Sequence, residues 1–127
     1  ELLKNTEQIF QKLKLPYRIL EMCSGQLSSW KSKSADLEVY RPTTKAYEEV
    51  TSLSNCTDYQ ARKLKIRILK KDGSKEIAHT LNNTVIATSR ALVAILENYQ
   101  QKDGSIKIPA ILQEYMNGLK AIKKHKI

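Results

Sequence analysis

The sequence predicts an α+β fold in which an antiparallel β-sheet is flanked by helices. Three observations carry this prediction: apolar residues recur at helical spacing near the N-terminus, several short β-like segments follow, and a long apolar stretch comes after them. The β-like segments have short connections, which favours antiparallel neighbours, because parallel strands need a crossover of a dozen residues or more. At 127 residues the chain is long enough for one compact core.

Residues 1–14 predict an amphipathic helix. Leu2, Ile9, Phe10 and Leu13 recur at the spacing of one helical face. Pro16 ends the pattern, because it restricts the residue before it and has no N–H to donate.

Three segments rich in Ile, Leu, Val and Tyr predict strands, at residues 17–23, 36–41 and 47–53. Residues 24–34 lie between the first two and are small and polar apart from Trp30, which is typical of a loop.

A further pair of strands is predicted at residues 64–68 and 75–81. Leu64, Ile66 and Ile68 alternate with charged residues, which is the period of a strand with one face in water. The pair Asp72-Gly73 supplies the positive φ that a chain reversal needs. We expect all five strands to form one antiparallel sheet.

Residues 85–99 predict a buried helix, because their apolar side chains are spread around most of the helical circumference. Pro109 is well suited to the first position of a short helix through Met116, and Gly118 to its end. We expect one domain over residues 1–118, followed by a basic C-terminal tail at residues 119–127.

The charge of the chain points to a polyanionic partner. There are 22 Lys and Arg against 13 Asp and Glu, a net charge of +9, and nucleic acid is the natural partner of such an excess. The alternative is that the lysines, which are spread along the chain, only solvate its surface.

Cysteine usage and hydropathy favour the cytoplasm. Cys23 and Cys56 are far apart, without the CxxC pairs or His clusters that would indicate a zinc site or a disulfide framework. The sequence also contains no apolar run of the length that a membrane span needs, so we expect no membrane partner.

Arg90 and the pair Glu48-Glu49 are the charged residues that call for an explanation. A guanidinium inside a buried helix needs an anion, either a ligand phosphate or carboxylate or an internal partner such as Glu97 or Glu49. Strand alternation places Glu48 and Glu49 on opposite faces, so only one can line a site. That carboxylate either holds Mg²⁺ beside a nucleotide or is an edge-strand charge.

Two longer segments resemble the C-terminal part of the catalytic core of the seryl-tRNA synthetases, which are class II aminoacyl-tRNA synthetases. Residues 47–62, YEEVTSLSNCTDYQAR, are similar to the ATP-binding strand of that family and the turn after it. Residues 79–90, HTLNNTVIATSR, are similar to class II motif 3 in its serine-specific form. The stretches LPYR and DLE at residues 15–18 and 36–38 resemble the region between motifs 2 and 3.

This resemblance implies a nucleotide site. Arg90 would be the motif 3 arginine, a catalytic residue that packs on the adenine of ATP and helps to hold the triphosphate. The carboxylate of Glu49 would bind the Mg²⁺ that accompanies ATP, while Val50, Thr51 and Ser52 would also line the nucleotide site. No protein nucleophile is needed, since the enzyme supplies alignment and charge stabilisation.

The resemblance also implies the substrates and the assembly. Asn82 and Thr84 would contact serine, and the complete enzyme would be a cytoplasmic, homodimeric serine–tRNA ligase that forms seryl-adenylate and transfers serine to tRNA(Ser). Residues 1–127 contain no counterpart of motif 1, motif 2 or the tRNA-binding arm, all of which would lie before Glu1. The 127-residue chain alone is therefore expected to be inactive.

Two other functions remain open at this point. A basic module that binds RNA without catalysis would account for the charge and the interspersed tyrosines. A non-catalytic synthetase relative that serves as a scaffold would keep the apolar core and lose the site residues, but Glu49, Asn82, Thr84 and Arg90 are all present.

Overall fold

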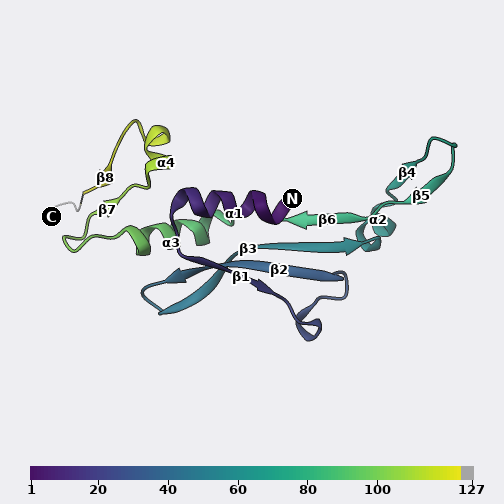
Figure 1. Cartoon of the computed structure of the whole chain (residues 1–127), viewed down its shortest axis with the longest axis horizontal. Coiled ribbons are helices and arrows are strands. Elements are labelled where there is room, and N and C mark those ends of the chain that lie inside the picture. The colour runs from purple at the N-terminus through teal and green to yellow at the C-terminus, as the bar shows by residue number, and fades with distance from the viewer. Residues whose placement is uncertain (124–127) are drawn as a thin grey trace.

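The computed structural model describes residues 1–123 of the chain (Figure 1). A sheet runs along the middle of the molecule, with helices beside it and a small hairpin at one end. In chain order the elements are α1 (Leu2–Leu13), β1 (Tyr17–Glu21), the 3-10 helix η1 (Ser24–Gln26), β2 (Lys33–Arg41), β3 (Ala46–Thr57), α2 (Tyr59–Leu64), β4 (Arg67–Leu69), β5 (Lys75–Ile77), β6 (Thr80–Asn83), α3 (Thr88–Tyr99), β7 (Ile106–Lys107), α4 (Ala110–Gln113), the 3-10 helix η2 (Glu114–Met116) and β8 (Ala121–Ile122).

The central sheet has four strands in the order β1-β2-β3-β6, and each strand is antiparallel to its neighbour. Its main part is the long β2–β3 hairpin, whose turn includes Lys45 at a φ of 54°. The pairing of β2 with β3 shifts between Leu37 and Glu38, which leaves Val50 as the extra residue of a β-bulge. The predicted antiparallel sheet flanked by helices is confirmed.

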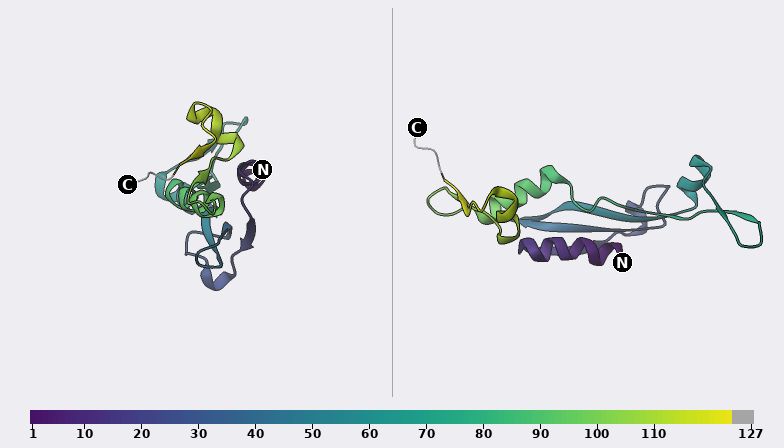
Figure 2. Two further views of the ribbon diagram at one scale, coloured as in Figure 1. Left: turned by 90° about the vertical axis from the view of Figure 1, so that its left-hand side faces the viewer. Right: turned by 90° about the horizontal axis from the view of Figure 1, so that it is seen from above.

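Helices α1 and α3 lie along the same side of this sheet (Figures 1 and 2). Between helices and sheet lies the core, in which Phe10, Leu37 and Val39 are completely buried. The core cluster consists of Phe10, Leu13, Leu15, Leu37, Val39, Val50, Ala91 and Ala94.

None of the α-helices in residues 1–123 covers the opposite face of the sheet, here named the open face. On this face Glu49 and Ser52 are partly exposed, whereas Ser34, Asp36 and Ser54 are buried.

Helix α1 confirms the prediction for the N-terminus, including its end before Pro16. Lys14 takes the left-handed conformation, its N–H donates to the carbonyl of Gln11 at 3.0 Å, and the N–H of Leu15 donates to the carbonyl of Phe10 at 3.2 Å. The Tyr99 hydroxyl donates to the carbonyl of Leu13 at 2.6 Å, which ties the C-terminal ends of α1 and α3 together.

The expectation of five strands in one sheet is wrong. Residues around Leu64 belong to α2, and β4 and β5 form a separate two-stranded sheet. The reason is that Thr57, at a φ of 45°, turns the chain off the end of β3 into α2, so β6 takes the place beside β3. The alternating residues Leu64, Ile66 and Ile68 are all exposed, so their period does not mark a face of the core.

The prediction that α3 is buried on all sides is also wrong. It begins at Thr88, and only Ala91 and Ala94 are buried, whereas Leu92 is 56% exposed. The reason is that only one side of α3 packs against the sheet. No helix within residues 1–123 is both long enough and apolar enough to cross a membrane.

The C-terminal part forms a small appendage of its own. Pro109 directly precedes α4, one residue before the helix and not at its predicted first position, while Gly118 stands at a φ of 76° after the helical turns, as predicted. Strand β8 pairs with β7, so the described part of the predicted tail, residues 119–123, is hydrogen-bonded to the preceding segment. Residues 124–127 of that tail lie outside the described residues, and the boundary at residue 118 stays a prediction.

Shortening Leu37 tests the position of the core. We expect Leu37→Ala to lower the free energy of unfolding by about 2–5 kcal/mol, because a fully buried leucine leaves a cavity when truncated. Leu64→Ala, at a leucine that is 70% exposed, is the matched control and should change stability by less than about 0.5 kcal/mol. Urea unfolding followed by circular dichroism measures both, and equal effects would contradict this description of the core.

Candidate functional site

The segment between β6 and α3 is fastened to the edge of β3 by backbone hydrogen bonds. The N–H of Thr84 donates to the carbonyl of Ser52 at 3.0 Å, and the N–H of Ala87 donates to that of Val50 at 3.1 Å. The Thr51 hydroxyl donates to the carbonyl of Thr84. These three bonds fix where α3 begins relative to β3, and therefore which residue of β3 its first turn faces.

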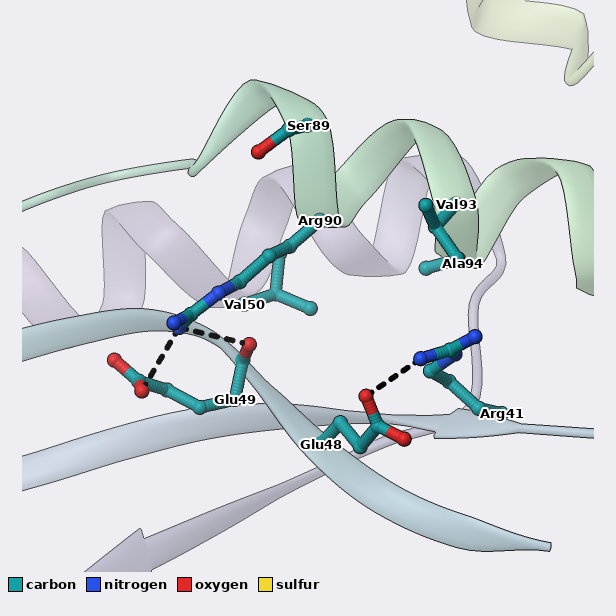
Figure 3. A pocket seen from close by; sticks show the side chains of 8 residues that line it. All are labelled: Arg41, Glu48, Glu49, Val50, Ser89, Arg90, Val93 and Ala94. Carbon is teal, nitrogen blue, oxygen red and sulfur yellow. Dashed lines mark hydrogen bonds and ion pairs between the residues drawn. The ribbon is translucent and has the colours of Figure 1, made fainter. Parts of the chain in front are cut away.

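Arg90 stands in that first turn and reaches Glu49 (Figure 3). One guanidinium nitrogen donates to the backbone carbonyl of Glu49 at 3.2 Å and lies 2.8 Å from the Glu49 carboxylate. The two side chains are 55% and 41% exposed, so the prediction that Arg90 is buried is wrong. Of the two internal partners considered, the structure selects Glu49 and not Glu97.

A pocket of about 350 Å³ lies between β3 and α3 at this point (Figure 3). It is lined by Arg41, Glu48, Glu49, Val50, Ser89, Arg90, Val93 and Ala94. Both neighbouring carboxylates line it, which corrects the prediction that only one of Glu48 and Glu49 could do so. The two side chains still alternate, since Glu48 lies opposite Val39 and Glu49 opposite Glu38. The reason is that β6 pairs with β3 only from Leu53 onward, so the edge of β3 at Glu49 has no strand partner and the pocket reaches around it to both faces.

Arg41 closes the pocket at the end away from Arg90. Its guanidinium lies 2.7 Å from the Glu48 carboxylate and forms a second ion pair with Glu97 of α3. Hydrogen bonds from Arg41 and then Thr43 hold the pKa of Glu97 at about 2, well below its usual 4.5. Hydrogen bonding to Glu97 and Glu48 raises the pKa of Arg41 further above its already high value. Arg41, Glu48 and Glu97 therefore remain charged over the whole physiological range.

The open face of the sheet carries the second group of polar residues. In the strand register Glu49 lies opposite Glu38, and Ser52 lies opposite Asp36. Arg18 pairs with Glu38 at 2.6 Å, and its guanidinium stands 4.7 Å from the centre of the Tyr47 ring. The open face beside Glu49 thus holds carboxylates, a hydroxyl and one cation.

Burial raises the pKa of Asp36, and a hydrogen bond from the Ser52 side chain works in the opposite direction. The charges of Glu49 and Glu38 raise this pKa further, whereas Lys31 lowers it. The pKa of Asp36 therefore depends on the charge of Glu49 as well as on its neighbour Ser52.

The predicted site residues fall into two groups. Glu49, Ser52, Asn82, Thr84 and Arg90 reach the surface on neighbouring stretches of β3, β6 and the start of α3. Asn82 lies opposite Ser54 in the β3–β6 register, on the same open face as Ser52.

Val50 and Thr51 form the second group, because their side chains are buried. The Val50 side chain belongs to the core, and the Thr51 hydroxyl is used by the Thr84 carbonyl. Any contact of these two residues with a nucleotide would therefore be made by their backbone.

Sequence reasoning missed Arg41, Arg18 and Tyr47. Arg41 could have been found from the hairpin, since it lies opposite Ala46 and therefore diagonal to Glu48, two residues further along the next strand. The pair of Arg18 with Glu38 has a similar signal in the β1–β2 register. The stacking of Arg18 on Tyr47 has no such signal, because it joins strands that are not neighbours in the sheet.

The residues fit a magnesium ion that arrives with a nucleotide better than one held by protein alone. Within residues 1–123, no group of three or more His, Cys, Asp or Glu side chains is close enough to hold a metal. Glu49 and Ser52 offer oxygen donors on one face of β3. Mg²⁺ prefers oxygen ligands and is commonly held by one or two carboxylates together with phosphates.

Comparison with known proteins identifies the class to which this fold and site belong. Residues 1–99 match the family described as the tRNA synthetase class II core domain (G, H, P, S and T). Because this match covers well over half of the 127 residues, the chain belongs to that family.

Within the family, proteins named serine–tRNA ligase match most of the chain. The serine–tRNA ligase of Dictyoglomus thermophilum is 54% identical over 120 residues, which are 94% of this chain and 28% of the relative. The serine–tRNA ligase of Methanoregula boonei is 51% identical over 119 residues, 92% of this chain and 28% of the relative. The predicted resemblance to the seryl-tRNA synthetases is thereby confirmed, and the chain spans about 28% of the length of these relatives.

Solved structures of the same kind share the fold. The crystal structure of seryl-tRNA synthetase from Pyrococcus horikoshii complexed with ATP superposes with a TM-score of 0.92 and 45% identity, over 98% of this chain and 28% of that one. The cytoplasmic serine–tRNA ligase of Naegleria fowleri in complex with AMP gives a TM-score of 0.89 and 41% identity, over 98% and 29% of the two chains. Both are complexes with adenine nucleotides.

Acid unfolding tests the Arg41–Glu97 ion pair. A carboxylate whose pKa is lowered on folding stabilises the fold above its unfolded pKa of about 4.5, and this contribution is lost as the pH falls towards about 2. We expect Glu97→Gln to lower the melting temperature by a few degrees at pH 7, and by progressively less between pH 4.5 and 2.

Glu114→Gln is the control, since Glu114 is exposed in η2. Thermal unfolding at several pH values measures both variants. A melting temperature difference for Glu97→Gln that is independent of pH would contradict the assignment.

Proposed function

We propose that this chain forms the ATP-binding and serine-binding wall of a serine–tRNA ligase core. The observation that carries the proposal is the convergence of Glu49, Ser52 and Asn82 on the open face of the sheet with Arg90 against Glu49. The serine–tRNA ligases to which the chain is similar support the assignment of substrate. The activity of the whole protein, its tRNA(Ser) substrate and its homodimeric state are part of this proposal.

The proposed reaction needs no nucleophile from the protein. A carboxylate oxygen of serine attacks the α-phosphorus of ATP, the bond to the bridging oxygen of pyrophosphate breaks, and seryl-adenylate forms. The protein contributes by aligning the two substrates and by stabilising the charge that moves onto pyrophosphate. An ester with the terminal ribose of tRNA(Ser) then replaces the bond to AMP.

In this proposal Arg90 changes partner when ATP binds. The exposed ion pair with Glu49 is weak, because solvent screens exposed pairs to about 1 kcal/mol or less. A planar guanidinium can stack on adenine and donate to a phosphate, which suits Arg90 for the role of the motif 3 arginine. Moving Arg90 to the nucleotide leaves the Glu49 carboxylate free for a cation.

Glu49 and Ser52 then provide oxygen atoms beside the phosphates. Magnesium bound with ATP would neutralise part of the triphosphate charge there. Asp36 lies opposite Ser52 in the strand register, where its carboxylate would orient that hydroxyl. The pocket beside Glu49 and Arg90 offers about 350 Å³ for part of the nucleotide.

Asn82 and Thr84 are proposed to contact serine. Asn82 projects from β6 on the same face as Ser52, and the backbone of Thr84 is fixed to β3, so that its exposed side chain is held in place. Polar groups that bind the serine hydroxyl disfavour analogues without it, because the groups would then be left unpaired.

Removing the Arg90 guanidinium tests the nucleotide site. We expect Arg90→Ala to weaken binding of Mg-ATP, and of a non-hydrolysable seryl-adenylate analogue, by about 2 kcal/mol or more, the usual effect of losing a charge-assisted contact. Arg62→Ala is the matched control, because Arg62 is also exposed and also pairs with a carboxylate, that of Asp58. Isothermal titration calorimetry measures both variants, and equal affinities in the two would refute the role of Arg90.

The 127-residue chain alone should show no serine-dependent exchange of pyrophosphate into ATP. Residues 1–127 hold no counterpart of motif 2, which would supply further contacts to ATP and serine. An exchange assay with the purified chain measures this directly. Activity above that of an Arg90→Ala control would contradict the expectation and would mean that this wall is sufficient for catalysis.

A further inference from the structure

The β4–β5 hairpin extends away from the rest of the molecule, beyond α2 (Figures 1 and 2). All residues from 62 to 76 are exposed. The turn is nevertheless well defined: the Asp72 carboxylate accepts hydrogen bonds from the N–H and the hydroxyl of Ser74, and Gly73 has the φ of 84° that the reversal needs. The hairpin is therefore an ordered projection that a partner can reach.

The hairpin and α2 hold most of the excess positive charge of the chain. Residues 59–77 contain seven Lys and Arg against two Asp and Glu, so these 19 residues account for five of the nine excess charges. Such a local concentration creates a positive potential that attracts polyanions. The excess is thus not spread evenly over the surface, as the solvation alternative requires.

In the register of β4 and β5, the charged side chains lie on two opposite faces of the hairpin. Arg67 lies opposite Ile77, and Lys75 opposite Leu69, so these four residues share one face. Ile68 and Glu76 lie on the other face, where Glu76 neutralises Lys70 at 2.6 Å. The first face has two cations and no carboxylate.

A small pocket continues this first face at the base of the hairpin. Its volume is about 190 Å³, and it is lined by Ala61, Arg62, Lys65, Arg67 and Ile77. Arg62 is held by Asp58 at 2.7 Å. Among the ion pairs formed within residues 1–123, none uses Lys65, Arg67 or Lys75, so these three charges are available to an external anion.

We propose that Lys65, Arg67 and Lys75, here named the basic hairpin face, bind the phosphate backbone of RNA. The pocket beside Lys65 and Arg67 accepts one phosphate group, and Lys75 contacts a second phosphate further along the hairpin. Neutralising phosphates releases their condensed counterions, which favours binding without any reading of sequence.

The choice of RNA rests on the proposed function, because a ligase that charges tRNA must hold a polyanionic substrate. Tyr59, which is 39% exposed and has Lys63 5.6 Å from its ring centre, provides an aromatic face next to the basic residues. Basic residues interleaved with aromatic ones are typical of nucleic-acid surfaces. An acidic protein partner would meet the same charges, so the experiment must separate it from RNA.

The test compares two triple variants of the chain. Lys65→Gln/Arg67→Gln/Lys75→Gln removes the basic hairpin face, and Lys4→Gln/Lys102→Gln/Lys107→Gln removes the same charge from exposed positions elsewhere. Fluorescence anisotropy with a labelled tRNA transcript gives Kd over a range of salt concentrations. Circular dichroism and Mg-ATP calorimetry on both variants show whether the fold and the proposed nucleotide site are intact.

We expect the hairpin variant to bind tRNA at least about tenfold more weakly at moderate salt, with the slope of log Kd against log salt reduced by about two. The control variant should stay close to the unmodified chain, and both should retain Mg-ATP binding. If the two variants lose tRNA affinity equally, or the hairpin variant loses none, the proposal is overturned while the nucleotide site stands. The same anisotropy measurement with polyglutamate tests an acidic protein as the partner. If the hairpin variant loses as much affinity for polyglutamate as for tRNA, the proposal is overturned in favour of an acidic protein. If neither variant nor the unmodified chain binds Mg-ATP, the proposed function is rejected instead.

Discussion

The hydrogen bonds between β3 and the segment after β6 are the constraint on which the site depends. They hold the backbone of Thr84 and Ala87 against β3, and this sets the register of α3 relative to the sheet. Arg90 meets Glu49 because of that register. At its other end α3 is held by Glu97, which binds Arg41 on β2. A short helix that is exposed on one side is thus fixed at both ends, and the pocket beneath it keeps its shape.

Local signals in the sequence were sufficient for much of the fold. Helix α1 was predicted correctly because the apolar period that forms it and the proline that ends it are both local features of the sequence. The turn at Gly73 was predicted correctly because it also depends only on adjacent residues. The sheet partners of the segment around Leu64 could not be predicted, because that segment alternates like a strand but turns away at Thr57. Exposure of α3 was missed since periodicity does not reveal which neighbours are present in a given chain.

In the candidate site, too, local features could be predicted from the sequence, whereas contacts between distant segments could not. An anionic partner for Arg90 was predicted from a burial that the structure does not show, but Glu49 was one of the two internal partners that this reasoning suggested. The selection of Glu49, and the engagement of Glu97 with Arg41, depend on how β2, β3 and α3 meet. Likewise, alternation along a strand places Glu48 and Glu49 on opposite faces but does not show that both line one pocket, because that pocket lies at an edge of β3 that β6 leaves unpaired.

The ion pair of Arg90 with Glu49 has a consequence for ligand selectivity. With the two charges satisfied by each other, the site is close to electrically neutral at rest and does not act as a general trap for anions. A bare phosphate that takes Arg90 leaves Glu49 next to it as a repelling negative charge. If Arg90 and Glu49 form the nucleotide site as proposed, a nucleotide that carries its own divalent cation would replace both partners at once. The internal pair would then favour a metal-loaded nucleotide over a bare phosphate.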